Sequence, residues 1–437
     1  MFDEKKSYNN NTYSVNVYIY NDDISLSAPD LITNEASGLI PPASILYIMI
    51  ENSLDGFIPR AELEFKDDAH ALSNKIKAQN CRMHINIRKS AGDEIVTYNL
   101  TFIVKDYKIL NASSEYTQYH IFGELDNAIP LNTLCEYATS CDLSNDNEQP
   151  ENPYKIAWSI LTQVGYKLYP LTVKNEDGKE IPTKYELPYL NDYCHFITYP
   201  NMRCIDALKY LFSYAVGENG TNPPAYLIHN LRDNKGYITT LENCFRPSSI
   251  RTQPKCTAFP FSITQSLVPN KEFKMDDVNT YSLDSGTENA QQFFNYKFAE
   301  YNQEERLWET YDISKLTLND LLTRGITNSD EASIFLKMLK EDISLSKYYK
   351  YVPHSHPIFY DVMRNLELYS SNLQFSLDGD MGFDVGQVLS IYEKGQNDSK
   401  VEQFNGRWLV YKVQHSFKNK LYRTNLVLCR RFHKYSF

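Results

Sequence analysis

A period-two alternation of apolar and polar side chains near the C-terminus limits most strongly what this chain can fold into. Residues 406–418 and 421–430 read as two strands joined by a short polar turn, and Val388-Leu-Ser-Ile-Tyr392 reads as a third strand before them. Residues 373–377 alternate in the same way. Because successive side chains of a strand point to opposite faces, this pattern predicts an antiparallel sheet with one buried face.

The same alternation marks the N-terminal part of the chain. Five segments carry it, namely Tyr13 to Tyr20, Ala61 to Phe65, Met83 to Ile87, Leu100 to Val104, and Tyr116 to Leu125. Ile45 to Ile50 is a continuous apolar run, which is typical of a strand that is buried on both faces. We therefore expect a small antiparallel barrel or sandwich here, with a short helix between Asp68 and Lys77.

A segment of mixed helical and strand pattern separates these two regions. A helix is expected from Pro153, which is favoured as a first helical residue, to a stop at Gly165. A second helix is expected over residues 202–216, followed by a hairpin with its turn at Asp233. Asn328-Ser-Asp-Glu331 has the spacing of a capping box and predicts a further helix.

Together these patterns predict a β-dominated α+β fold with two antiparallel β barrel or sandwich modules and two insertions. The expected segments are a first β module at residues 1–130, an α+β insertion at 131–257, the start of a second β module at 258–310, a helical insertion at 311–362, and the remainder of the second module at 363–437. A chain of 437 residues exceeds the usual size of one core, which agrees with several domains.

Charge, cysteine content and apolar runs limit the class of partner. The net charge of −11 argues against tight nucleic-acid binding, because such proteins need a basic surface to displace counterions from phosphates. None of the 8 cysteines forms a CxxC pair, so we expect reduced thiols in a protein made in a reducing cytosol. The longest apolar run, Ala43 to Ile50, is too short for a membrane helix, and the N-terminus lacks a signal-peptide pattern, so no membrane partner is expected.

Nothing in the sequence requires an enzyme. His354 and His356 form the only close histidine pair, in a loop between prolines that supplies no third metal ligand. Glu62 and Glu64 share one face of a strand, as polar residues of strands commonly do. Nucleotide-binding, nucleophile-elbow and zinc-protease motifs are missing from the sequence. We therefore expect no catalytic residue, no cofactor and no bound metal.

The C-terminal strands carry an ordered set of residues that resembles a known family. The set consists of Gly386, Val388, Gly406, Trp408, Val410, Val413, His415, Tyr422, Thr424, Leu426, Leu428 and Arg430. It is similar to the last strands of the baseplate central hub proteins of contractile-tailed phages, a group that includes the T-even hub, the late-control D proteins and the hub half of type VI spike proteins. Pro59 and Asp67 match a strand of that family's first module, whereas Arg203-Cys204 departs from the usual threonine of its middle helix.

The resemblance implies that both β modules are tail-tube-like and that the protein is a structural component of the virion, assembled in the host cytoplasm. Three copies would form a homotrimer with a pseudo-sixfold ring, which joins the hexameric tail tube protein to the threefold central spike protein. The ring would contact other baseplate (wedge) proteins and let genome DNA pass without specific binding. The resemblance also implies packing roles for Trp408, Val410 and Val413, a sharp strand entry at Gly406, and a structural role for His415.

Two alternatives stay open at the level of sequence. One is a related hub-like component of a short or non-contractile tail or of a contractile injection device. The other, from a different class, is a tail-delivered carbohydrate-active enzyme. The mass of the purified protein separates the hub from the enzyme, and a neighbouring sheath gene favours the contractile tail.

Overall fold

The computed structural model describes most of the N-terminal region, parts of the middle of the chain and the C-terminal strands. The described residues are 5–7, 11–21, 38–77, 80–91, 94–138, 153–169, 172–174, 180–182, 196–213, 225–231, 234–240, 255–258, 262–264, 272–274, 278–284, 299–302, 307–310, 372–393, 406–418 and 421–429. The expected helix after Asn328, the pair His354 and His356, and Arg430 lie outside the described residues.

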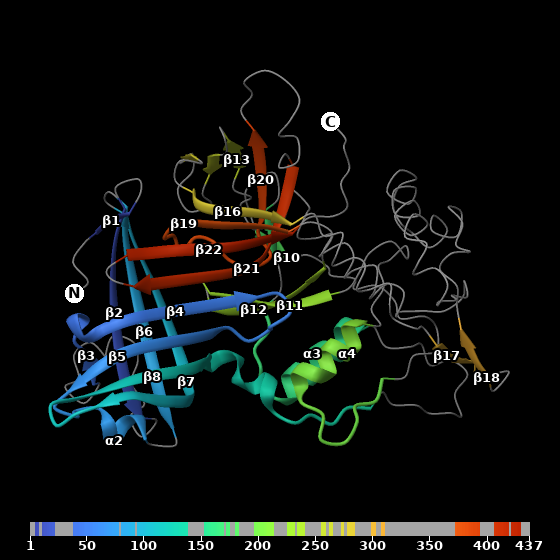
Figure 1. Ribbon diagram of the computed structural model, residues 1–437. Helices are drawn as coiled ribbons and strands as arrows, with labels where there is room; N and C mark the ends of the chain where they lie inside the picture. Colours follow the sequence, from blue (N-terminus) through green and yellow to red (C-terminus); the bar gives the residue numbers. More distant parts are fainter. Residues whose placement is uncertain are drawn as a thin grey trace.

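An antiparallel sheet forms the N-terminal part of the molecule (Figure 1). Its strands are β1 (Lys5–Ser7), β2 (Asn11–Asn21), β3 (Leu39–Ile40), β4 (Ile45–Ser53), β5 (Arg60–Asp68), β6 (Cys81–Ala91), β7 (Glu94–Ala112) and β8 (Tyr116–Leu125). They pair in the order β1-β2-β6-β7-β8-β5-β4, and β3 adds to β2. The short helix α2 (Ser73–Ile76) follows β5, and a 3-10 turn (Pro42–Ser44) leads into β4. The six expected strands and the short helix are therefore confirmed.

Alternating burial accounts for these strands and corrects one expectation. Every second residue of β8 is buried, and the residues between them stay partly accessible. In β4 only one face is buried, because Tyr47, Met49 and Glu51 are half-buried on the other face. The expectation that residues 45–50 are buried on both faces is therefore wrong. Tyr47 and Met49 extend the apolar run over a face that remains partly accessible.

The C-terminal strands join the N-terminal sheet directly. They are β19 (Asn372–Asp378), β20 (Val388–Glu393), β21 (Gly406–Lys418) and β22 (Leu421–Cys429). β21 pairs with β22 along one edge and, along its other edge, with β20 and then with β4. The contact with β4 is antiparallel and runs from the pair Lys412 and Ser53 to the pair Lys418 and Tyr47. Segments from opposite ends of the sequence thus form one continuous sheet, in which β4 and β21 lie side by side (Figure 1).

Short strands extend this sheet further. They are β13 (Lys255–Ala258), β14 (Ser262–Thr264), β15 (Glu272–Lys274) and β16 (Val278–Asp284), while β17 (Ala299–Asn302) and β18 (Leu307–Thr310) form a separate hairpin. β13 pairs with β20 in parallel, and β16 pairs with β19 in antiparallel. The 16-stranded sheet and the few described helices confirm the β-dominated α+β class. The boundaries of two modules stay predictions, because one sheet runs through both.

The expected α+β region contains two helices and two hairpins. They are α3 (Pro153–Gln163), α4 (Cys204–Ser213), the hairpin of β9 (Thr172–Lys174) with β10 (Glu180–Pro182), and the hairpin of β11 (Ala225–Asn230) with β12 (Lys235–Thr240). A 3-10 segment, Asp126–Asn132, leads from β8 to this region. Gly165 has a φ of +79°, which a glycine adopts easily, and it ends α3 as expected. None of the described helices has the length and apolar composition that a membrane crossing requires.

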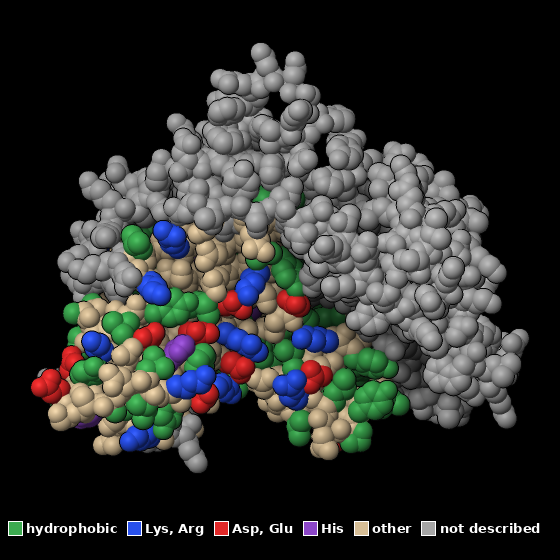
Figure 2. Space-filling view, in the orientation of Figure 1, with side chains coloured by type: hydrophobic (Ala, Val, Ile, Leu, Met, Phe, Trp, Pro, Cys, Tyr) green, Lys and Arg blue, Asp and Glu red, His purple; other side chains and the backbone are tan. Residues whose placement is uncertain are grey.

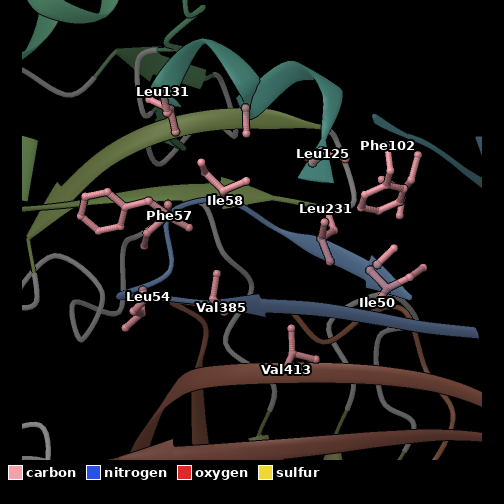
Figure 3. Close-up of a cluster of buried hydrophobic side chains, with 14 of the residues drawn as sticks. Ile50, Leu54, Phe57, Ile58, Phe102, Leu125, Leu131, Leu231, Val385 and Val413 are labelled. Carbon is pink, nitrogen blue, oxygen red and sulfur yellow. The ribbon is translucent and has the colours of Figure 1, made fainter. Parts of the chain in front are cut away.

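One buried apolar cluster connects the N-terminal sheet, the α+β region and the C-terminal strands. Figure 3 shows part of this cluster, where the labelled side chains are Ile50, Leu54, Phe57, Ile58, Phe102, Leu125, Leu131, Leu231, Val385 and Val413. All ten are buried. A core shared in this way holds the three parts of the chain together as one body, because close-packed interiors resist relative movement.

Candidate functional site

The apolar motif residues of the last hairpin lie in the core. Trp408, Val410 and Val413 of β21 and Leu426 and Leu428 of β22 are each at most 1% exposed. These side chains point into the apolar cluster rather than toward a partner. Their burial agrees with the packing role that the family resemblance implies.

Other motif residues of the C-terminal region shape the backbone. Gly386 has a φ of +75°, a left-handed conformation that favours glycine, and its N–H donates to the Val410 carbonyl at 2.9 Å. Val388 begins β20, and Gly406 begins β21 opposite Ile391. These residues set where β20 and β21 meet.

The two motif residues of the N-terminal sheet lie at opposite ends of β5. The Pro59 carbonyl accepts a hydrogen bond from the Leu125 N–H at 2.9 Å, which holds the start of β5 to the end of β8. Asp67 is 3% exposed, and its two carboxylate oxygens accept the Leu72 N–H at 3.0 and 3.1 Å. Burial raises the pKa of Asp67, and the hydrogen bond from Leu72 acts in the opposite direction. Asp67 therefore fixes the turn that leads into α2.

His415 is fully buried between the two strands of the last hairpin. Its Nδ1 atom lies 3.0 Å from the Tyr422 hydroxyl and 3.2 Å from the Thr424 hydroxyl. The Tyr422 ring stacks on Phe417 with 4.1 Å between ring centroids. Burial lowers the pKa of His415 to about 3, so the ring is neutral at physiological pH. These contacts agree with a structural role for the histidine.

The neutral His415 ring makes the stability of the fold depend on pH. Its pKa is about 3 in the folded chain, whereas an unfolded histidine has a pKa of about 6.5. Between these values the unfolded state binds one more proton, so the free energy of unfolding falls as the pH falls from about 6.5 toward 3. In urea titrations between pH 6 and pH 4.5, we expect the native chain to lose about 1.4 kcal/mol per pH unit more than His415→Gln. Equal slopes for both proteins would contradict a buried neutral ring.

A buried ion pair joins the N-terminal sheet to the C-terminal strands. Lys89 of β6 and Asp380, which follows β19, have side chains only 2% exposed, and the Lys89 Nζ atom lies 3.1 and 3.2 Å from the two Asp380 carboxylate oxygens. The Gly382 N–H donates to the same carboxylate at 2.7 Å, and the Tyr13 ring lies 5.8 Å from Nζ. Burial raises the pKa of Asp380, whereas the Lys89 ammonium acts in the opposite direction.

A second buried junction links three parts of the chain. The Asn52 side-chain amide of β4 donates to the His229 carbonyl of β11 at 2.6 Å and to an Asp384 carboxylate oxygen at 2.9 Å. The other Asp384 oxygen accepts the Leu231 N–H at 2.6 Å. The His229 ring itself lies 3.1 Å from the Tyr166 hydroxyl. One aspartate thus binds the N-terminal sheet and the α+β region at once.

Both aspartates belong to one segment, residues 379–387, which we call the junction loop. Every residue of this loop is buried, although it lies between strands β19 and β20. Gly379 packs so closely against the Tyr422 ring that a side chain at this position would overlap the ring. Buried charged groups require partners, and here Asp380 pairs with Lys89, while Asp384 accepts hydrogen bonds from Asn52 and from the Leu231 N–H. The junction loop therefore fixes how the N-terminal and C-terminal halves meet.

None of these junction residues belongs to the motifs recognised in the sequence. Asp380 and Asp384 carry a sequence signal, since two acids in a glycine-containing stretch are typical of a specialised turn. Lys89 carries no such signal. It lies in a strand of alternating pattern, and a buried lysine cannot be told from an exposed one there until the strand pairing is known. The two aspartates and Lys89 come together only through the pairing of strands far apart in sequence.

The pair of glutamates on β5 lies on the accessible face of the sheet and interacts with β8. Glu62 Oε2 lies 3.2 Å from His120 Nε2, and Glu64 Oε1 accepts a hydrogen bond from the Gln118 side chain at 2.6 Å. Figure 2 shows acidic and basic side chains interleaved over the region of β4, β5 and β8. Each glutamate thus takes part in a cross-strand contact of the kind expected on a polar sheet face.

Metal-binding clusters and reactive thiols are the remaining candidates for chemistry. In the part of the chain that the structure describes, no three His, Cys, Asp or Glu side chains come together in a metal-binding arrangement. Four of the described cysteines are buried and form no disulfide in the part of the chain that the structure describes, namely Cys81, Cys135, Cys204 and Cys429. Burial raises the pKa of Cys81 and of Cys204 to about 12, so these two thiols stay protonated at neutral pH.

Several solved structures are similar to this chain at low sequence identity. The 43 kDa tail protein of prophage MuSo2 from Shewanella oneidensis has 10% identity and a TM-score of 0.45, with 95% of this chain and 97% of that chain covered. The tail protein from Neisseria meningitidis MC58 has 10% identity and a TM-score of 0.48, with 96% of each chain covered. The E. coli c3393 protein, a component of the type VI secretion system, has 10% identity and a TM-score of 0.39, with 90% and 75% covered.

No protein-family model matches the sequence, and no curated protein matches it. Similarities of this size between structures assign neither an activity nor an assembly to this chain.

Proposed function

We propose that this chain is a structural protein of a phage tail baseplate and forms the central hub as a homotrimer. The observation that carries the proposal is the position of the motif-bearing strand β21, which pairs with β22, β20 and β4 and so joins both ends of the chain in one sheet. Two buried polar junctions, through Asp380 and Asp384, add to this connection. A hub that joins partners of different symmetry needs such a firmly connected body.

The proposed assembly follows from the number of β-rich halves in each chain. Three chains with two tail-tube-like halves each present six similar units to a hexameric tail tube and a threefold face to a central spike. Interfaces in permanent assemblies of this kind bury on the order of 2,000 Å² or more. Wedge proteins would bind the outside of the ring, and genome DNA would pass through it without specific binding. We also propose that the surrounding tail is contractile and that the protein itself has no enzymatic activity.

Exposed apolar side chains at one end of the sheet are candidates for the interface between copies. Leu421, Ile109 and Leu110 are each about half exposed, at 50%, 51% and 49%. Leu421 pairs with Lys418 across the last hairpin. From Lys418, successive cross-strand partners in β4, β5 and β8 lead to Lys108, which directly precedes Ile109 and Leu110 in β7. These apolar groups therefore lie at the same end of the sheet, where a neighbouring copy would cover them.

The mass of the purified full chain in solution tests the homotrimer. Light scattering or native mass spectrometry is expected to show three copies of the 50.8 kDa chain at micromolar concentration. A stable monomer that cleaves glycans would contradict the hub. Triple replacement of Leu421, Ile109 and Leu110 by aspartate is expected to shift the mass toward the monomer, whereas Ile95→Asp, at the opposite end of β7, is not. A trimer that survives the triple replacement would place the interface elsewhere on the chain.

A further inference from the structure

The residues that follow α3 form a small ladder with β12. Leu168 and Gly236 are partners in a parallel bridge, and the Tyr169 N–H donates to the Gly236 carbonyl at 3.0 Å. Leu168 is buried, and the Tyr166 ring packs directly on Gly236, where any side chain would overlap it. One face of this ladder is therefore closed, and its register is fixed.

The opposite face of the ladder carries two lysines and two tyrosines. Because side chains alternate along a strand, the bridge places Lys167 beside Lys235 and Tyr169 beside Tyr237. The Nζ atoms of Lys167 and Lys235 lie 5.2 and 4.8 Å from the centroid of the Tyr169 ring. The centroids of the Tyr169 and Tyr237 rings lie 6.4 Å apart. We call these four residues the Lys–Tyr array.

The charges of the Lys–Tyr array are not balanced by the residues around it that the structure describes. Like charges on neighbouring strands repel one another, and here two ammonium groups approach the same aromatic ring. No ion pair joins Lys167 or Lys235 to a carboxylate among the described residues, whereas Lys89, Lys105 and Lys412 each have one. Lys167 is exposed, and Lys235, Tyr169 and Tyr237 are partly accessible. An anion placed between the two ammonium groups would relieve their repulsion.

We propose that the Lys–Tyr array binds an acidic segment of a partner protein through two neighbouring carboxylates. Each carboxylate would accept a charge-assisted hydrogen bond from one lysine, and the tyrosine rings would pack against the carbon atoms between the two charges. Two cations suit a pair of carboxylates. A nucleic acid is disfavoured, because its affinity depends on many phosphate contacts and the chain carries a net charge of −11. The site is independent of the hub proposal, since it lies within one chain.

Binding of a fluorescently labelled hexaglutamate peptide to the purified full chain tests the proposal. Fluorescence anisotropy at low salt is expected to show saturable binding that weakens as salt is added. The double variant Lys167→Gln with Lys235→Gln is expected to weaken binding by about 10-fold or more, and each single variant by about 3-fold, which corresponds to the loss of one charge-assisted contact at an accessible site. The matched control is Lys66→Gln, because Lys66 also lies over a tyrosine ring, 5.0 Å from the Tyr116 centroid, but no second lysine of the described residues lies over that ring. Its affinity is expected to equal that of the native chain.

Several outcomes would overturn the proposal. They are the absence of hexaglutamate binding by the native chain, equal binding by the double variant, and equal binding of a hexaglutamine peptide. Tighter binding of an oligothymidylate of equal charge, lost in the same double variant, would assign the array to phosphodiesters instead. Thermal melting separates binding from folding, because the double variant is expected to melt no lower than the native chain once the repulsion is removed. Added hexaglutamate is expected to raise the melting temperature of the native chain alone.

Discussion

Removal of either partner of the buried pair Lys89 and Asp380 is expected to destabilise the chain by about 3–5 kcal/mol. Both side chains are only 2% exposed, so Lys89→Met leaves a buried carboxylate without its cation, and Asp380→Asn leaves a buried ammonium without its anion. In either case the remaining group must stay charged in a poorly solvated site or change its protonation state. The free energy of unfolding, measured by urea denaturation with circular dichroism, checks the prediction.

The matched control is the ion pair between Lys412 and Glu51, which also joins the two ends of the sequence. Its atoms approach to 2.8 Å, but the side chains are 36% and 27% exposed. Lys412→Met is therefore expected to cost no more than about 1 kcal/mol, because water solvates the remaining carboxylate. Equal losses for Lys89→Met and Lys412→Met would contradict the burial of the first pair.

The double variant Lys89→Met with Asp380→Leu separates two quantities. They are the contribution of the ion pair to the free energy of unfolding and the destabilisation caused by one buried charge left without its partner. An apolar pair of similar size removes both charges, so the loss is expected to be smaller than for either single variant. The expected coupling exceeds about 1 kcal/mol, because the two side chains are in direct contact. Additive losses would show that the two residues do not interact in the folded chain.

Trp408→Ala is expected to destabilise the chain by about 3–5 kcal/mol, because the side chain is fully buried and its removal leaves a cavity in the core. Trp408 lies opposite Leu389 of β20, at the part of β21 that precedes its contact with β4. Circular dichroism is the suitable probe, since the substitution removes one of only 3 tryptophans and would change the fluorescence itself. A loss below about 1 kcal/mol would show that the last hairpin is not part of the core.

Trp158→Ala provides the comparison for Trp408→Ala. Trp158 lies on α3 with 38% of its surface exposed, and the centroids of the Trp158 and Tyr154 rings lie 5.8 Å apart. We expect its loss to cost about 1 kcal/mol or less, because most of the cavity would open to solvent. The difference between the two variants reports burial rather than the chemistry of tryptophan.

Local pattern predicted most of the strands because the physics behind it is local. Alternation at residues 13–20 and 116–125 identified β2 and β8, and Pro153 with Gly165 bounded α3. Prediction failed in β4, where Tyr47 and Met49 made a half-accessible face look buried. An apolar side chain at an accessible position costs little, so the sequence carries no mark that separates the two cases.

The candidate site was less predictable than the strands. The motif in the last hairpin marked Trp408 and His415, and both side chains are buried. The junction residues Lys89 and Asp380 had no partner visible in the sequence, because a charge reveals its role only when its surroundings are known. The same holds for the Lys–Tyr array, whose lysines are separated along the chain by β9, β10, α4 and β11.

The sequence by itself determined most of the long strands and the two described helices of the α+β region, since side-chain alternation, proline and glycine act on their immediate neighbours. It also determined that the final hairpin is apolar on one face. Only the tertiary structure decided that β21 pairs with β4 and that the junction loop buries one aspartate against the N-terminal sheet and the other against both that sheet and the α+β region. Such pairings depend on contacts between distant residues, and the burial that makes a charge costly, or a partner necessary, exists only after the chain has folded.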